Sequence, residues 1–70
     1  MTPSPTRLFC LHTLTSLQGV GWVGKNGLTE AKVKWLADNG YVTAEPSPKG
    51  GIRVRLTELG VEAVAKDKNP

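Results

Sequence analysis

The 70-residue sequence predicts one small α+β domain in which helices pack on a two-stranded β-hairpin. Three segments are predicted to be helices because each begins after a good capping residue, and two of them carry apolar residues at helical spacing. Between the second and third helices, two short strand-like runs flank a turn rich in proline and glycine. We expect residues 6–66 to form the domain, with a flexible leader at 1–5 and a frayed tail at 67–70.

The first helix is expected from Pro5 to about Gln18, because Ser4 is a good N-cap and proline suits the first helical position. Phe9 falls on the polar side of this helix, where it either packs under the leader or contacts a partner or a second copy of the chain. The opposite side is apolar and should face the core, and it holds Leu8, Cys10, Leu11, Leu14 and Leu17.

Residues 19–27 are rich in glycine, with four glycines in nine residues. Each glycine inside a helix costs about 1 kcal/mol relative to alanine, so this segment is a poor helix and favours a loop around Trp22. The glycines do not indicate a phosphate-binding loop, because no Gly-Lys-Ser/Thr sequence accompanies them.

The second helix is expected to run to about Asn39, with Thr29 as its N-cap and Gly40 as its stop. A strand is predicted directly after this stop, at residues 41–45. The short distance between the two elements predicts that the strand leaves the helix through a tight turn at the glycine.

The second half of the predicted hairpin has the clearer pattern. Residues 52–56 alternate strictly, so Arg53 and Arg55 should face solvent while the three apolar residues face the core. The turn before them holds two prolines and two glycines. Thr57 is then expected to cap a last helix that runs to about Lys66.

The net charge of +3 is carried unevenly along the chain. The first half holds four cationic side chains against Glu30 alone, and residues 46–57 hold three with no acid, namely Lys49, Arg53 and Arg55. Two basic patches on a nearly balanced chain suit a nucleic-acid footprint. An ordinary solvated surface explains these charges equally well. The two arginines therefore either contact phosphate or form a solvated strand face, paired with Glu45 across the hairpin.

Composition argues against several other classes of protein. The chain has no apolar run near the roughly 18 residues of a membrane span, and its N-terminus lacks a signal-peptide pattern. The single cysteine cannot form an internal disulfide, which favours a cytoplasmic protein and a role as core filler. His12 has no second ligand at metal spacing, and we find no catalytic constellation, so neither an enzyme nor a cofactor is expected.

Two motifs resemble the winged helix-turn-helix family. Residues 36–42 (LADNGYV) are similar to the exit of the recognition helix in MarR-type and PadR-type regulators, and residues 55–60 (RLTELG) are similar to the junction after their wing. A helix-turn-helix frame also fits residues 19–38, except that Gly21 and Gly24 lie inside its first helix. The resemblance implies a winged helix-turn-helix fold, with that first helix either a single turn or an irregular loop.

The resemblance also implies where DNA would bind. The second helix would enter the major groove, and the hairpin would act as a wing on the flanking backbone. In this frame the contacts on or beside the helix would be Lys25, Thr29, Lys32, Lys34 and Trp35. The wing would add Lys49, Arg53 and Arg55. A tryptophan at this position is more often part of the core or of a partner surface than a base reader, so Trp35 also has that interpretation.

The sequence therefore predicts a small, sequence-specific DNA-binding regulator of transcription from a bacterium or a bacteriophage. Its partner would be double-stranded DNA, with a homodimer as the expected assembly. The alternative is a winged helix used as a protein-interaction module, such as an inhibitor or accessory subunit of a nucleic-acid machine, with Phe9 and Trp22 as partner contacts. A DNA-bending accessory protein of recombination is the weaker alternative.

Overall fold

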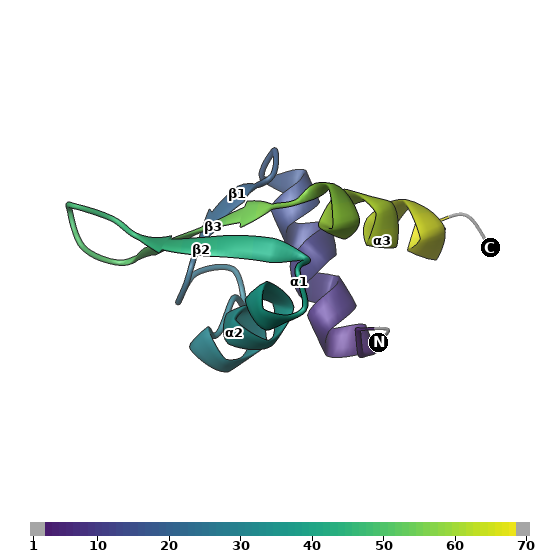
Figure 1. Cartoon of the computed structure of the whole chain (residues 1–70), viewed down its shortest axis with the longest axis horizontal. Helices are drawn as coiled ribbons and strands as arrows, with labels where there is room; N and C mark the ends of the chain where they lie inside the picture. The colour runs from purple at the N-terminus through teal and green to yellow at the C-terminus, as the bar shows by residue number, and fades with distance from the viewer. Residues whose placement is uncertain (1–2, 69–70) are drawn as a thin grey trace.

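The computed structural model of the chain describes residues 3–68, which form three helices and one three-stranded antiparallel sheet (Figure 1). In chain order the elements are α1 (Pro5–Ser16), β1 (Val20–Trp22), α2 (Glu30–Asp38), β2 (Val42–Pro46), β3 (Ile52–Leu56) and α3 (Glu58–Lys68). The predicted α+β class is confirmed. The β2–β3 hairpin projects beyond the helices, and the molecule measures 40 × 22 × 19 Å.

Helix α1 begins as predicted, because the Ser4 hydroxyl accepts a hydrogen bond from the backbone N–H of Arg7 at 3.4 Å. It ends two residues before the predicted Gln18. Gln18 and Gly19 both have left-handed backbones, with φ angles of 63° and 89°. The N–H of Gly19 donates to the carbonyl of Leu14 at 2.7 Å, which closes the helix and directs the chain into β1.

The first helix of the helix-turn-helix frame is absent, as the glycines of this segment indicated, but the segment is not simply a loop. Residues 19–27 contain β1 and a series of turns instead. Gly24, Asn26 and Gly27 have φ angles of 90°, 56° and 79°, which a right-handed helix cannot contain. The predicted two-stranded sheet is wrong for the same reason, because β1 pairs with β3 and the strand order is β1-β3-β2.

Gly21 lets β1 lie directly on the core. A Cβ atom at this position would be 2.8 Å from side-chain carbons of both Leu14 and Leu28. Any larger residue would have to push these two buried leucines aside. A glycine that counts against a helix in the sequence is therefore the residue that this short strand requires.

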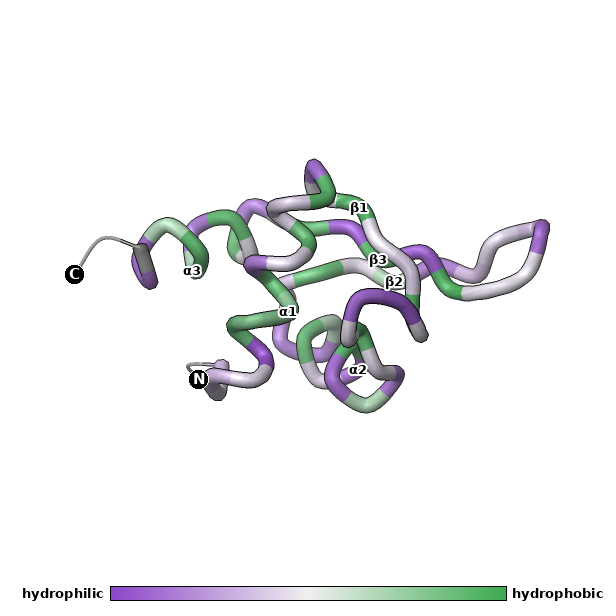
Figure 2. The backbone as a smooth tube through the Cα atoms, turned by 180° about the vertical axis from the view of Figure 1, so that it is seen from behind, coloured by the Kyte–Doolittle hydropathy of each residue, from purple (hydrophilic) through white to green (hydrophobic). Residues whose placement is uncertain are grey.

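Helix α2 begins and ends at the predicted caps. The Thr29 hydroxyl accepts from the backbone N–H of Lys32 at 3.4 Å, and Gly40 ends the helix with a φ angle of 82°. Val33 and Leu36 are the buried residues of this helix and lie on its inner side. The other buried apolar residues of the core are Cys10, Leu11, Leu14, Leu28, Tyr41, Val42, Val54 and Val64. Figure 2 shows hydrophobic stretches in the middle of the molecule and a largely hydrophilic hairpin tip.

A network of hydrogen bonds joins the exit of α2 to the start of α3. The N–H of Thr57 donates to the Tyr41 carbonyl at 3.1 Å, and its hydroxyl donates to the Gly40 carbonyl at 2.6 Å. The same hydroxyl accepts from the N–H of Gly60 at 3.2 Å, so Thr57 caps α3 as predicted. Gly60 lies so close to Tyr41 that a Cβ atom would collide with the Tyr41 carbonyl oxygen. The two motifs at 36–42 and 55–60 thus form the two sides of one joint.

Both ends of the described chain are attached to the domain. Helix α3 continues through Asp67 to Lys68, beyond the predicted end at Lys66. Nε2 of His12 in α1 lies 2.6 Å from Oδ2 of Asp67 and ties the two helices together. Pro3 is buried, so the leader packs on the domain from this residue onward. The rest of the predicted leader and tail, residues 1–2 and 69–70, lies outside the described residues.

Candidate nucleic-acid interface

The exposed side of α2 carries charges of both signs. Glu30, Lys34 and Asp38 are exposed there. Together with Ala44 and Ile52 of the hairpin, they line a groove between α2 and the sheet. One cation between two acids gives this groove little attraction for phosphate, so α2 alone is a weak anchor for a nucleic acid.

Trp35 is half-buried and held by two neighbours. The guanidinium carbon of Arg7 lies 4.3 Å from the Trp35 ring centroid, in cation–π geometry. The Tyr41 ring is stacked on the indole, with centroids 6.1 Å apart and an interplanar angle of 8°. This geometry fits the interpretation of Trp35 as part of the core better than its interpretation as a base reader.

Two other predicted contacts, Thr29 and Lys32, lie at the N-terminal end of α2. Lys32 is half-buried, and its charge acts on Cys10 in α1. Burial raises the pKa of the Cys10 thiol, and the positive charge of Lys32 opposes only part of that rise. The Thr29 hydroxyl caps the helix. Among the predicted contacts on or beside α2, the exposed cations are therefore Lys25 and Lys34.

The hairpin arranges its arginines as the alternation predicted. Strand β2 pairs with β3 so that Thr43 lies opposite Arg55 and Glu45 lies opposite Arg53. Both arginines are exposed, whereas Val54 between them is buried. Nη2 of Arg53 lies 3.7 Å from Oε2 of Glu45, which confirms the predicted pairing. Their side chains are 44% and 58% exposed, so water screens this ion pair.

Lys49 lies at the tip of the hairpin, and its side chain is exposed. The tip is closed by a hydrogen bond from the N–H of Ser47 to the carbonyl of Gly51 and by another from Gly50 to Ser47, both at 3.0 Å. Gly50 and Gly51 have positive φ angles of 95° and 80°, which glycine adopts without strain. The turn therefore presents one cation at the most distant point of the hairpin.

Strand β1 brings Trp22 beside the arginines, a juxtaposition that sequence reasoning missed. Trp22 lies opposite Arg53, and Val20 lies opposite Arg55. Directly opposed residues of paired strands share a face, so Trp22 joins both arginines on the outer face of the sheet. The only signal in the sequence was the alternation of a large residue, Gly21 and another large residue. Three residues are too few to identify a strand.

The predicted DNA footprint is divided between two sides of the sheet. Lys34 lies on the inner side, in the groove beneath the hairpin. Arg53 and Arg55 lie on the outer side, with Trp22. Lys25 is exposed in the turn after β1, where its N–H donates to the Trp22 carbonyl at 3.3 Å. The structure brings the hairpin arginines together with an aromatic ring and separates them from the lysine of α2.

Phe9 is the most exposed of the large apolar residues and lies on α1. Its exposed fraction is 63%, so the interpretation in which it packs under the leader is wrong for the described residues. The other interpretation, a contact with a partner or a second copy of the chain, fits this exposure. Its place on α1 sets it apart from the charged residues of α2 and the hairpin.

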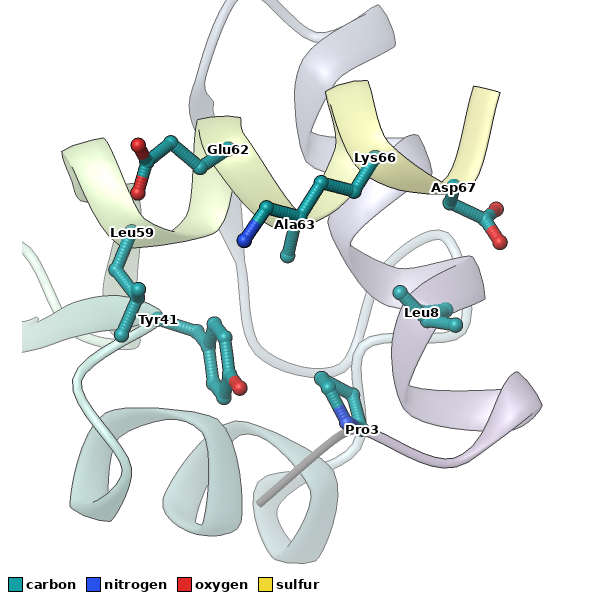
Figure 3. Close-up of a pocket in the computed structure, with 8 residues that line it drawn as sticks. All are labelled: Pro3, Leu8, Tyr41, Leu59, Glu62, Ala63, Lys66 and Asp67. Atoms are coloured by element: carbon teal, nitrogen blue, oxygen red, sulfur yellow. The ribbon is translucent and has the colours of Figure 1, made fainter. Parts of the chain in front are cut away.

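A separate cleft lies where α1, α3 and the start of β2 meet (Figure 3). Its walls are largely apolar, with Leu8, Tyr41 and Leu59 among them. Asp67 at its rim is already paired with His12. The charged side chains of this cleft, Glu62, Lys66 and Asp67, all come from the exposed side of α3.

The structure also limits which other sites are present. The part of the chain that it describes contains no group of three or more His, Cys, Asp or Glu side chains that could hold a metal ion. Within residues 3–68, no helix has the length and apolar character needed to cross a membrane. Comparisons with protein-family models, curated proteins and solved structures found no match.

Proposed function

We propose that this protein is a small winged-helix regulator of transcription, from a bacterium or a bacteriophage, that binds double-stranded DNA through α2 and the β2–β3 hairpin. The two motifs that resemble the family support the proposal, because Thr57 of the second motif is hydrogen-bonded to the carbonyls of Gly40 and Tyr41 in the first, at 2.6 and 3.1 Å. A helix beside a projecting hairpin also suits a duplex, since the helix fits the major groove while the hairpin follows the backbone.

The distribution of charge is the observation that carries the proposal. Residues 20–56, which span β1 to β3, hold six Lys and Arg residues against three Asp and Glu residues. Helix α3 holds two lysines against three acids, and α1 holds a single arginine. The positive end of the molecule is therefore the end with α2 and the hairpin, and a negatively charged duplex is attracted to that end.

The hairpin supplies most of the attraction in this proposal. Lys49 and the two arginines of β3 contact phosphate or the minor groove, while Lys34 is the exposed cation of α2. Each good contact between a side chain and a base pair adds only about 1–3 kcal/mol of discrimination. A single protomer would thus bind weakly and with little specificity, and a homodimer on two half-sites would supply the rest.

A second function is favoured by a different observation. The groove beside α2 is nearly balanced in charge, and Phe9 on α1 is 63% exposed. An exposed aromatic residue is a good anchor for a protein interface, and a groove with one cation and two acids suits a protein surface better than phosphate. In this function the chain is an interaction module that acts on a nucleic-acid machine as an inhibitor or accessory subunit.

Duplex binding by matched charge variants tests the proposal. The double variant Lys49→Gln with Arg55→Gln removes two cations from the hairpin, and Lys66→Gln removes one from α3 as the control. With a fluorescently labelled duplex, the hairpin variant should bind more weakly, with the slope of log K against log salt reduced by about 0.9 for each lost contact. Lys66→Gln should bind as the native protein does. Equal effects of the two variants would contradict a footprint on the hairpin.

A further inference from the structure

The outer face of the sheet is largely open to solvent. At one end, Val20 and Arg55 border a groove whose other walls come from the end of α1 and from α3. The side chains of α1 and α2 pack on the inner face, where Gly21, Val42 and Val54 are buried. The strand registers place six residues on the opposite face in two rows, one of Trp22, Arg53 and Glu45 and the other of Val20, Arg55 and Thr43. Five of these six residues are exposed, and Val20 is half-buried.

Trp22 is a fixed aromatic surface on this outer face. An ideal Cβ on Gly51 would lie 3.6 Å from the six-membered ring of the indole, so the backbone of the hairpin supports the ring on one side. On each side of the residue the backbone is bonded as well. The Trp22 carbonyl accepts from Lys25, and the N–H of Val23 donates to the Ile52 carbonyl at 3.0 Å. The Trp22 side chain is nevertheless 38% exposed, so the ring can accept a second planar group.

The charge next to Trp22 is positive. Arg53 and Arg55 lie two residues apart on one strand, which places their Cα atoms roughly 7 Å apart along it. Glu45 is the one acid on this face, and its contact with Arg53 is a screened pair at 3.7 Å. Arg55 forms no ion pair within residues 3–68, and Lys49 adds another exposed cation at the tip.

We propose that the outer face of the sheet, defined by Trp22, Arg53 and Arg55, binds single-stranded nucleic acid. One base stacks on the Trp22 ring, and the phosphates on either side of it contact the two arginines. An aromatic platform flanked by cations is how proteins bind unpaired strands, because every base has a face that can stack. A duplex does not offer such a base, since its bases are already stacked on one another.

This inference goes beyond the proposed function because it concerns the other side of the sheet. The groove beside α2 lies on the inner side, and residues that line it are distinct from the outer-face residues. Charge favours a nucleic acid over an apolar protein partner here, because cations outnumber acids on this face and only Trp22 and Val20 are apolar. Arg53 and Arg55 take part in both proposals, so substitution of Trp22 is the change that distinguishes single-strand binding from duplex binding.

The test is the binding of a labelled oligothymidylate of about ten nucleotides to the full-length protein at low salt. Trp22→Leu keeps an apolar side chain but removes the stacking face, and it should raise the dissociation constant about 5- to 150-fold. Trp22→Phe keeps an aromatic face and should retain most of the affinity. Leu59→Ala removes an apolar side chain of α3 that is 44% exposed and is the control, for which no change is expected.

Fluorescence gives a second readout that does not depend on the stability of a Trp22 variant. The chain has two tryptophans, so Trp35→Phe leaves Trp22 as the single reporter. The oligonucleotide should quench this variant's emission, because the base stacks on the remaining indole. An unquenched signal at saturation would overturn the stacking contact.

Three results would separate this inference from the proposed function. Binding of the oligonucleotide without binding of a duplex supports the inference and contradicts the proposed function. Binding of a duplex alone overturns the inference and leaves the proposed function in place. Equal affinity of Trp22→Leu and the native protein for the oligonucleotide also overturns it, whatever the duplex does.

Discussion

The two faces of the sheet have opposite properties, although the same strands form both. On the inner face, Val54 belongs to the same buried cluster as Leu14 and Leu36. On the outer face, its neighbours Arg53 and Arg55 are exposed. Successive residues of β3 thus have different roles: Val54 contributes to the stability of the fold, whereas Arg53 and Arg55 are available for binding. Substitutions on the inner face should change the free energy of unfolding, and those on the outer face should change affinity.

The largest effect is expected in the core, where α2 packs against the inner face of the sheet. Leu36→Ala removes a fully buried side chain and should lower the free energy of unfolding by about 2–5 kcal/mol. Lys34→Ala on the exposed side of the same helix is the control and should stay within about 0.5 kcal/mol. Chemical denaturation of both variants measures the difference. Equal midpoints and slopes would contradict the packing of α2 on the sheet.

A smaller loss is expected at the joint between α2 and α3. Alanine normally favours a helix over glycine by about 1 kcal/mol, so Gly60→Ala would stabilise an ordinary helix. Here the added Cβ collides with the backbone carbonyl of Tyr41, which cannot move as a flexible side chain can. We therefore expect a net destabilisation of about 1–3 kcal/mol in thermal melting. A stabilised Gly60→Ala variant would show that α3 does not approach Tyr41 closely.

A loss of similar or smaller size is expected when the Thr57 hydroxyl is removed. Thr57→Ala loses both the cap of α3 and the bond to the Gly40 carbonyl, and it should cost about 1 kcal/mol. Thr57→Ser restores a hydroxyl and should recover most of that loss in the same denaturation experiment. If serine is no better than alanine, the hydrogen bonds of the hydroxyl contribute little.

The smallest change in stability is expected on the outer face. Arg53→Ala with Arg55→Ala removes two exposed side chains and one screened ion pair, so each substitution should change the free energy of unfolding by less than about 0.5 kcal/mol. The same double variant should bind both duplex DNA and oligothymidylate more weakly than the native protein. Denaturation and binding measured on one preparation test the two statements together. A large loss of stability would contradict the claim that outer-face residues affect affinity and not the free energy of unfolding.

Elements with strong local signals were predictable from the sequence. Ser4, Thr29 and Thr57 cap the three helices as expected, and the exposure of Arg53 and Arg55 followed from alternation alone. These features depend on residues within a few positions of one another. For this reason they need no knowledge of the tertiary fold.

The strand that the sequence did not predict, β1, depends on contacts with residues far away in the chain. β1 is three residues long and is stabilised by pairing with β3, which follows α2 and β2 in the chain. Gly21 is informative only once Leu14 and Leu28 are known to lie against it. The position of Trp22 beside the arginines follows from the same pairing, so the sequence could not reveal the outer surface. Similarly, the role of Trp35 depends on Arg7 and Tyr41.

Binding of a labelled duplex across a range of salt concentrations is the most direct test of the proposed function. Within residues 20–56, four exposed cations have no ion pair: Lys25, Lys34, Lys49 and Arg55. Each phosphate contact releases counterions and contributes a slope of about −0.9 in log K against log salt. If these four reach phosphate, one protomer should show a slope of roughly −3 to −4. A signal independent of salt, or no binding even at about 50 mM salt, would contradict duplex binding and favour the protein-interaction module.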